Sequence, residues 1–205
     1  MTSNLASVGR VLASARTRAA LSLGVVMAVG ATGTFAYWTD DAVISGTSFT
    51  AGTLDLQVNN GNSYATTTLS MTGMVPGNTS AEVLTIKNNG TVPLKYTMSG
   101  GLTGTDAVAY GTAGSLLLTV VLNGTRSGTG NSSTCTGGTT IVAPVALTAT
   151  PGTAIIGVRR PTTALAATAT ESLCFQVTLD PNAPSSLQGK TATATFTATG
   201  TSDVS

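Results

Sequence analysis

Histidine is absent from the 205 residues of this chain. This absence excludes a Ser-His-Asp or Cys-His catalytic device, and it excludes the histidine-dependent zinc site of the common metalloproteases. Among the eight carboxylates only Asp40 and Asp41 are adjacent. No Asp-rich loop supplies the roughly six to eight oxygens that Ca²⁺ takes. We therefore expect a protein that is not an enzyme, with no metal and no cofactor, and with Asp40 and Asp41 as a solvated pair.

Charged residues are also scarce, at 8% of the chain against about a quarter in typical globular proteins. Thr, Gly, Ala and Ser take their place, so the surface is built from hydroxyl groups rather than ions. Three of the nine basic residues lie near the N-terminus, at Arg10, Arg16 and Arg18. No basic patch remains elsewhere, and the few aromatic residues do not alternate with Lys or Arg. We therefore expect no nucleic-acid partner.

The N-terminal stretch has the three parts of an export signal. Met1–Arg18 is basic and free of acidic residues, Ala19–Gly33 is apolar, and a small residue, Ala36, stands at the expected cleavage position. We predict a signal peptide over residues 1–36, cut between Ala36 and Tyr37. The alternative is an uncleaved membrane anchor, because the apolar run is close to the ~18 residues that a membrane span requires.

Two cysteines, Cys135 and Cys174, both fall in the predicted exported part. An even number of cysteines in an oxidising compartment favours one disulfide. Closing a loop of that length would contribute up to about 4 kcal/mol. Two separate buried thiols are the alternative.

From Val43 onward the chain shows short β-branched runs separated by Gly, Asn and Pro, without sustained helical periodicity. The apolar fraction, 41%, is enough to bury a core. We predict strands at Val43–Thr50, Thr53–Val58, Thr66–Thr72, Ala81–Lys87, Leu94–Met98, Leu116–Leu122, Thr139–Ala146, Ala154–Val158, Ser172–Leu179 and Thr191–Thr199. The predicted fold is all-β: one two-sheet antiparallel sandwich with jelly-roll-like connections over residues 51–205, preceded by a helical signal peptide.

Three short stretches carry separate predictions of local structure. Asn89-Gly90 predicts a hairpin between the strands on either side of it. Leu116–Leu122 is nearly all apolar, which favours a central strand over a short buried helix. Thr162–Thr170 is rich in Ala and Thr, and a loop and a short helix are both open there.

Several short sequence blocks follow one another in a fixed order. The predicted leader ends in GTFA, and the following chain begins YWTDD. Next comes a motif formed by Phe49, Ala51, Gly52, Thr53, Leu54, Asp55 and Leu56. Two further blocks follow, one running from Val75-Pro76-Gly77-Asn78 to Lys87-Asn88-Asn89-Gly90 and the other over Gln188–Ala192. Together these blocks resemble the TasA/camelysin family of exported biofilm-matrix proteins. This chain departs from the family in its shorter middle, its few lysines and its cysteine pair.

The resemblance implies a jelly-roll subunit that is exported by the Sec route, cut by a dedicated signal peptidase and assembled into extracellular fibres. Its partners would be other copies of itself, joined head to tail, and possible further matrix components. The implied assembly strand is Tyr37 to about Thr50, in which the candidate contact residues are Tyr37, Trp38, Val43, Ile44 and Phe49. Gly52 is a candidate hinge.

Physical chemistry supports the same assignment, because an extended segment that is free at a new N-terminus can add to a sheet edge. Two alternatives remain. Val43–Thr50 can be the first strand of the domain's own sheet, and the protein can be a monomeric surface binding module or adhesin. Such a module would use the loops Gly100–Gly114 and Gly124–Gly138.

Overall fold

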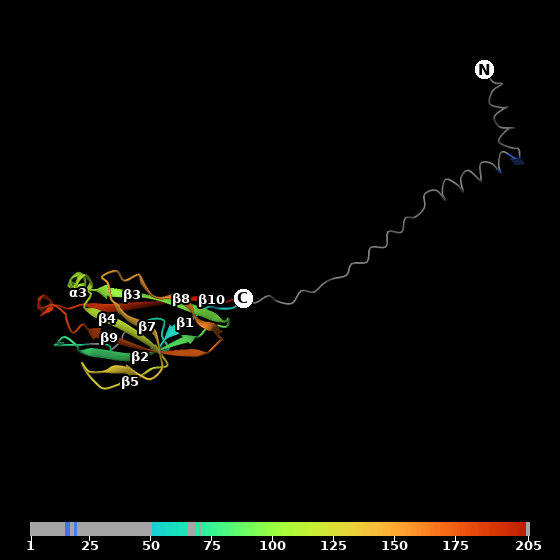
Figure 1. The fold of residues 1–205 in the computed structure, drawn as a ribbon. Coiled ribbons are helices and arrows are strands. Elements are labelled where there is room, and N and C mark those ends of the chain that lie inside the picture. The colour runs from blue at the N-terminus through green and yellow to red at the C-terminus, as the bar shows by residue number, and fades with distance from the viewer. Residues whose placement is uncertain (1–14, 17–18, 20–50, 65–68, 70, 204–205) are drawn as a thin grey trace, which may run out of the picture. The chain divides into compact units, whose positions relative to one another are not determined.

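The structure is a computed structural model that describes residues 15–16, 19, 51–64, 69 and 71–203 (Figure 1). The chain divides into two units, Met1–Phe49 and Thr50–Ser205. In the first unit, Ala15, Arg16 and Ala19 are helical and exposed. No helix within the described ranges has the length and apolar character that crossing a membrane requires. The predicted cleavage site at Ala36 and Tyr37, and the other candidate assembly residues Trp38, Val43, Ile44 and Phe49, lie outside the described residues.

The second unit is a sandwich of two antiparallel sheets, as predicted (Figure 1). The larger sheet has the strand order β1-β2-β9-β4-β7 and the smaller one β10-β3-β8, while β5 and β6 form a separate two-stranded sheet. The strands are β1 Leu56–Val58, β2 Thr79–Asn88, β3 Leu94–Thr103, β4 Leu116–Leu122, β5 Thr125–Ser127, β6 Thr134–Thr136, β7 Thr139–Ala146, β8 Thr153–Leu165, β9 Thr170–Leu179 and β10 Thr193–Ser202. A helix, α3, covers Ala107–Ala113, and a 3-10 turn, η1, covers Ser185–Leu187.

The pairing of the strands is that of a jelly roll. β2 pairs with β9, β3 with β8, β4 with β7 and β5 with β6. The strands of the first half therefore pair in reverse order with those of the second half, as in a long hairpin that has been rolled up. The two remaining strands extend the sheets outward, β1 beside β2 and β10 beside β3.

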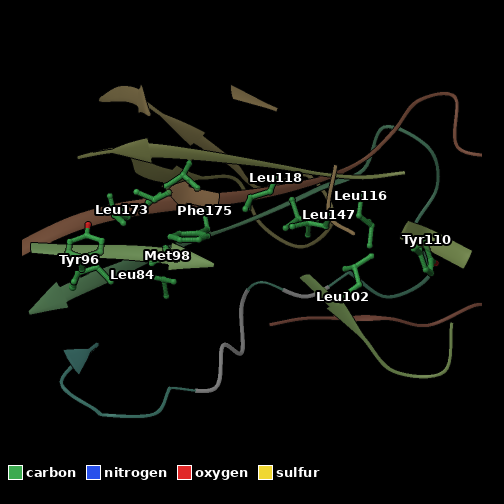
Figure 2. Close-up of a cluster of buried hydrophobic side chains, with 14 of the residues drawn as sticks. Leu84, Tyr96, Met98, Leu102, Tyr110, Leu116, Leu118, Leu147, Leu173 and Phe175 are labelled. Carbon is green, nitrogen blue, oxygen red and sulfur yellow. The ribbon is translucent and has the colours of Figure 1, made fainter. Parts of the chain in front are cut away.

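The core lies between the two sheets and follows from the two-residue period of the strands. In β2, Leu84 and Ile86 are buried, and in β9 the same holds for Leu173, Phe175 and Val177. Figure 2 shows Leu84, Leu173 and Phe175 of this set beside Tyr96 and Met98 of β3 and Leu118 of β4. The rings of Phe175 and Phe196 contact each other across the two sheets, with centroids 5.2 Å apart and planes tilted by 57°. Within the described residues, no buried side-chain nitrogen or oxygen lacks a hydrogen-bond partner.

The predicted hairpin across Asn89-Gly90 is wrong, because β2 and β3 belong to different sheets. A tight hairpin turn of the usual kind needs positive φ at both central residues, and neither Asn89 nor Gly90 has it. The buried side chain of Asn88 instead donates hydrogen bonds to the carbonyl oxygens of Val92 and Leu165 at 2.8 and 2.9 Å. These bonds hold the crossing between the sheets.

The other local predictions have mixed outcomes. Leu116–Leu122 is a strand between β9 and β7, as expected. The Ala/Thr-rich stretch Thr162–Thr170, for which a loop and a short helix were both open, begins as a strand, since β8 continues through Leu165. Of the predicted strand Thr66–Thr72, the described residues Leu69, Met71 and Thr72 lie outside any strand. The helix α3 was not predicted, and its seven residues are too few for a clear helical period.

Candidate functional site

The two large sheets end in four edge strands, β1, β7, β8 and β10. An exposed edge strand can pair with a strand of another molecule, and proteins prevent this with short edge strands, proline, charged residues or bulges. β1 has three residues. β7 contains Pro144 and a shifted register, and β8 contains Arg159, Arg160 and Pro161 together with three shifts of register. These three edges are therefore protected.

The fourth edge strand, β10, carries none of these protections. Its ten residues include no proline and no charge, and its pairing with β3 runs without a shift from Thr193 to Ser202. Within the part of the chain that the structure describes, its other edge pairs with no strand. A long, regular and uncharged edge is a site at which a further strand adds by backbone hydrogen bonds.

The orientation of β10 shows which groups that edge offers. The amide of Asp203, just after the strand, donates to Pro93 next to β3 at 2.9 Å. Backbone N–H and C=O groups alternate in direction along a strand. Those of the odd-numbered residues of β10 therefore bond to β3, and those of the even-numbered residues point away from β3, toward the open edge. Ala198 is one of these even-numbered residues, and its side chain lies on the face toward the sandwich interior.

An apolar groove of about 500 Å³ runs beside this edge. It is formed by side chains of β1, β2, β3 and β10 together with the segment before β2, including Leu56, Val58, Tyr64, Leu69, Leu84, Met98, Ala194, Phe196 and Ala198. The inward side chains of β10 that line it are only partly buried. An incoming strand would therefore find both an open backbone edge and apolar surface for its side chains.

The far rim of the groove is held by Glu82 on β2. Its carboxylate accepts hydrogen bonds from the Tyr64 hydroxyl at 2.7 Å and from the Leu69 amide at 3.2 Å. The hydrogen bond to Glu82 raises the pKa of Tyr64. This contact ties the segment between β1 and β2 to the rim.

The family motif lies where the described domain begins, and it contacts the second motif block. The Thr91 amide donates to the Thr53 carbonyl at 2.9 Å, and the Asn89 amide donates to the Asp55 carbonyl at 2.8 Å. The Asp55 carboxylate also accepts from the Asn89 side chain at 2.8 Å. Two blocks more than thirty residues apart in the sequence therefore form one anchor at the root of the N-terminal segment.

Close packing explains the two glycines of this anchor. A Cβ at Gly90 would lie 2.3 Å from the Thr53 carbonyl oxygen, and one at Gly52 would lie 2.0 Å from a methyl group of Val92. Glycine is needed at Gly90 because the obstructing atom belongs to the backbone, whereas at Gly52 the Val92 side chain would have to shift. The role of Gly52 as a hinge stays a prediction. Leu54 is 47% exposed and Leu56 lines the groove.

The predicted disulfide between Cys135 and Cys174 is present. It joins β6 to the central strand β9 on the outer face of the five-stranded sheet. Ala81, Val121 and Cys174 form a small buried cluster there, separate from the main core. The alternative of two separate thiols is excluded.

Sequence reasoning missed a buried ionic network. Arg160 of β8 donates to both carboxylate oxygens of Glu171, at 2.7 and 3.0 Å, and the Tyr96 hydroxyl of β3 donates to the same carboxylate. Burial and then the hydrogen bond to Glu171 raise the pKa of Tyr96. Burial lowers the pKa of Arg160, but its bonds to Glu171 and Tyr96 outweigh this effect and raise it overall. The network links the two sheets, and a lone Glu opening an apolar strand was the only signal for it.

Comparison with protein families gives a match over the N-terminal part of the chain. Residues 8–106 match the family described as camelysin metallo-endopeptidase. The match covers just under half of the chain and includes both blocks of the anchor. It confirms the resemblance to the TasA/camelysin family. None of the curated proteins compared with the chain matches it.

The name of this family, camelysin metallo-endopeptidase, implies a metal. The described carboxylates each bond to other groups of the protein: Asp55 to Asn89, Glu82 to Tyr64, Asp106 to Lys190, Glu171 to Arg160, Asp180 to Asn182 and Asp203 to Lys95. Among the described residues, no three His, Cys, Asp or Glu side chains gather into a possible metal site. With no histidine in the chain, this donor set does not fit a histidine-held zinc. That the protein is not an enzyme stays a prediction.

Proposed function

We propose that this TasA/camelysin-type chain is a secreted structural subunit of extracellular, biofilm-matrix fibres, in which each copy donates its mature N-terminal strand to a neighbour. The donated strand is Tyr37–Thr50, freed when a signal peptidase cuts after Ala36. The product lies at the cell surface or in the extracellular matrix.

The observation that carries this proposal is the unprotected edge of β10 beside an apolar groove. Val43 and Phe49 lie on one face of the predicted donor strand, so both would point into the groove while the backbone pairs with β10. The 14 residues of the donor span roughly 46 Å when extended, and the ten residues of β10 span roughly 33 Å. The donor is therefore long enough to cover the whole edge.

The anchor supports a head-to-tail arrangement. It holds the root of the N-terminal segment beside Thr91 and Val92, close to where β10 ends at Ser202. A donor that enters the next copy where that copy's β10 begins would run antiparallel to it, and the contact would repeat in one direction. Repetition of such a contact gives an open filament instead of a closed ring.

Matched variants of β10 test the proposal. Ala198→Asp places a carboxylate on the groove side, and Thr199→Asp places the same charge on the exposed opposite face of the same strand, at a residue that does not line the groove. Burying an unpaired polar group is costly, so the first variant is expected to lower fibre yield by at least about tenfold while the second assembles normally. Electron microscopy of protein beginning at Tyr37 gives the readout, with circular dichroism to show that both variants fold. Equal assembly by the two would refute strand addition in this groove.

A second function, that of a monomeric surface binding module, is favoured by one observation. A second groove, of about 510 Å³, lies at the α3 end of the sandwich between Met71, Met74, Tyr110 and Leu187. Its volume is in the range of small-ligand pockets. Protein that begins at Tyr37, stays monomeric and is retained on a glycan or matrix column would favour this function over the first. Mass spectrometry of the secreted N-terminus tests the cleavage separately.

A further inference from the structure

Part of β2, in the five-stranded sheet, forms a sheet edge that is covered by a loop and not by a strand. β1 pairs with β2 only opposite Ile86–Asn88, so it leaves the first half of β2 uncovered. There the Thr79 amide donates to the Asn131 carbonyl at 2.9 Å, and the Ala81 amide donates to the Ser133 hydroxyl at 2.9 Å. The loop between β5 and β6 therefore occupies the place that a neighbouring strand would take.

This hairpin, Thr125–Thr136, which we name the guard hairpin, has little to hold it together by itself. Its two strands have three residues each, and all three residues of β5 are exposed. Isolated two-stranded hairpins are marginally stable at best. The bridge from Cys135 to Cys174 fixes it to the sheet, assisted by a bond from the Cys135 amide to Gln176 at 2.9 Å. The disulfide is a covalent cross-link between the guard hairpin and β9, and the Asn131 side chain adds a hydrogen bond to the Thr72 carbonyl at 2.9 Å.

We propose that the guard hairpin closes a second strand-accepting edge on β2, and that reducing Cys135–Cys174 opens this edge to the N-terminal strand of another copy. The reductant is a dithiol, which becomes a cyclic disulfide while Cys135 and Cys174 each take up one electron and one proton. In the oxidised protein, strand addition is confined to β10, which gives an unbranched filament. In the reduced protein, the edge from Thr79 to Val83 accepts a second donor and filaments branch or cross-link.

The identity of the incoming strand rests on the proposed function, but the closing of the edge does not. Hydrogen exchange at the Thr79 and Ala81 amides tests the closing of the edge by itself. It is measured in protein beginning at Tyr37. Reduction is expected to speed exchange at both amides by at least about tenfold, since each loses a hydrogen bond and its cover. Exchange at Phe175 in the core reports whether the fold survives. Unchanged exchange at Thr79 and Ala81 would overturn the guard, whatever the fibres do.

Assembly is then measured in a background that cannot use β10. Ala198→Asp protein is expected to remain monomeric when oxidised and to assemble when reduced. Adding Thr79→Pro should abolish the reduced assembly, because proline is tolerated as the first residue of a strand but cannot donate to an incoming one. Reduced Ala198→Asp protein that stays monomeric, or that assembles equally with Thr79→Pro, would overturn the second acceptor edge.

A variant with an intact disulfide keeps the test decisive if reduction unfolds the domain. Ser133→Ala removes the acceptor of the Ala81 amide and leaves the bridge in place. Exchange at Ala81 should rise several-fold while exchange at Phe175 does not change. Ser132→Ala, one residue away and exposed, is the matched control and should leave Ala81 unaffected. Equal exchange at Ala81 in the two variants would contradict the proposed cover.

Discussion

The buried network of Arg160, Glu171 and Tyr96 gives a prediction whose size follows from the structure. Glu171→Gln keeps the shape of the side chain but removes its charge, so the guanidinium of Arg160 is left between the sheets without its counter-ion. The two side chains are 15% and 9% exposed. Removing one partner of a buried pair costs about 3–5 kcal/mol, and the residual exposure of Arg160 places the expected loss near the lower limit, at about 3 kcal/mol.

The chain offers a more exposed ion pair as control. Lys95 and Asp203 are 2.9 Å apart, but their side chains are 23% and 21% exposed. Exposed ion pairs contribute about 0–1 kcal/mol, so Asp203→Asn should have a small effect. The free energies of unfolding are measured by urea titration with the disulfide intact. With a slope of about 2 kcal/mol per molar urea, Glu171→Gln should lower the midpoint by about 1.5 M.

The result that would refute this reasoning is a loss of stability in Glu171→Gln no greater than that in Asp203→Asn. A double replacement, Arg160→Met with Glu171→Leu, adds a second check. Apolar side chains of similar size remove both charges together, so this variant should be more stable than Glu171→Gln alone.

Three further predictions concern pH and the anchor. Burial and the hydrogen bond to Glu171 raise the pKa of Tyr96, so the folded state keeps a proton that the unfolded state releases above about pH 10. The contribution of Tyr96 to stability is therefore complete below that pH and is lost as the pH rises. In urea titrations, Tyr96→Phe should make this loss of stability with pH shallower. Hydrogen bonds from the Thr191 amide and then from Lys190 lower the pKa of Asp106. The contribution of Asp106 to folding stability is therefore present above about pH 4 and is lost as the pH falls. Asp106→Asn should remove this dependence of stability on acid pH. Gly90→Ala brings a Cβ to 2.3 Å from the Thr53 carbonyl oxygen, so it should cost about 1–3 kcal/mol and speed proteolysis near Ala51, whereas Gly152→Ala, in open space, should change neither.

Much of the architecture followed from local pattern. Alternating side chains in Ala81–Lys87 located a strand and its buried face, with Leu84 and Ile86 inward, because the two-residue period of a strand is a local property. Ser172–Leu179 was also located as a strand, without a predicted face. The disulfide was predictable because the chain has only two cysteines and both lie in the predicted exported part. The order of the motif blocks indicated the family before any contact between them was visible.

Strand partners and edges were decided by tertiary structure alone. Asn89-Gly90 has the composition of a hairpin turn, yet the buried side chain of Asn88 and the chain at Thr53 hold it as a crossing between sheets. The threonine-rich pattern of β10 predicted a strand but not that its outer edge would be left without protection. Sequence determined which residues face inward, since that depends on neighbours along the chain, whereas packing determined which edges stay open, since that depends on segments distant in sequence.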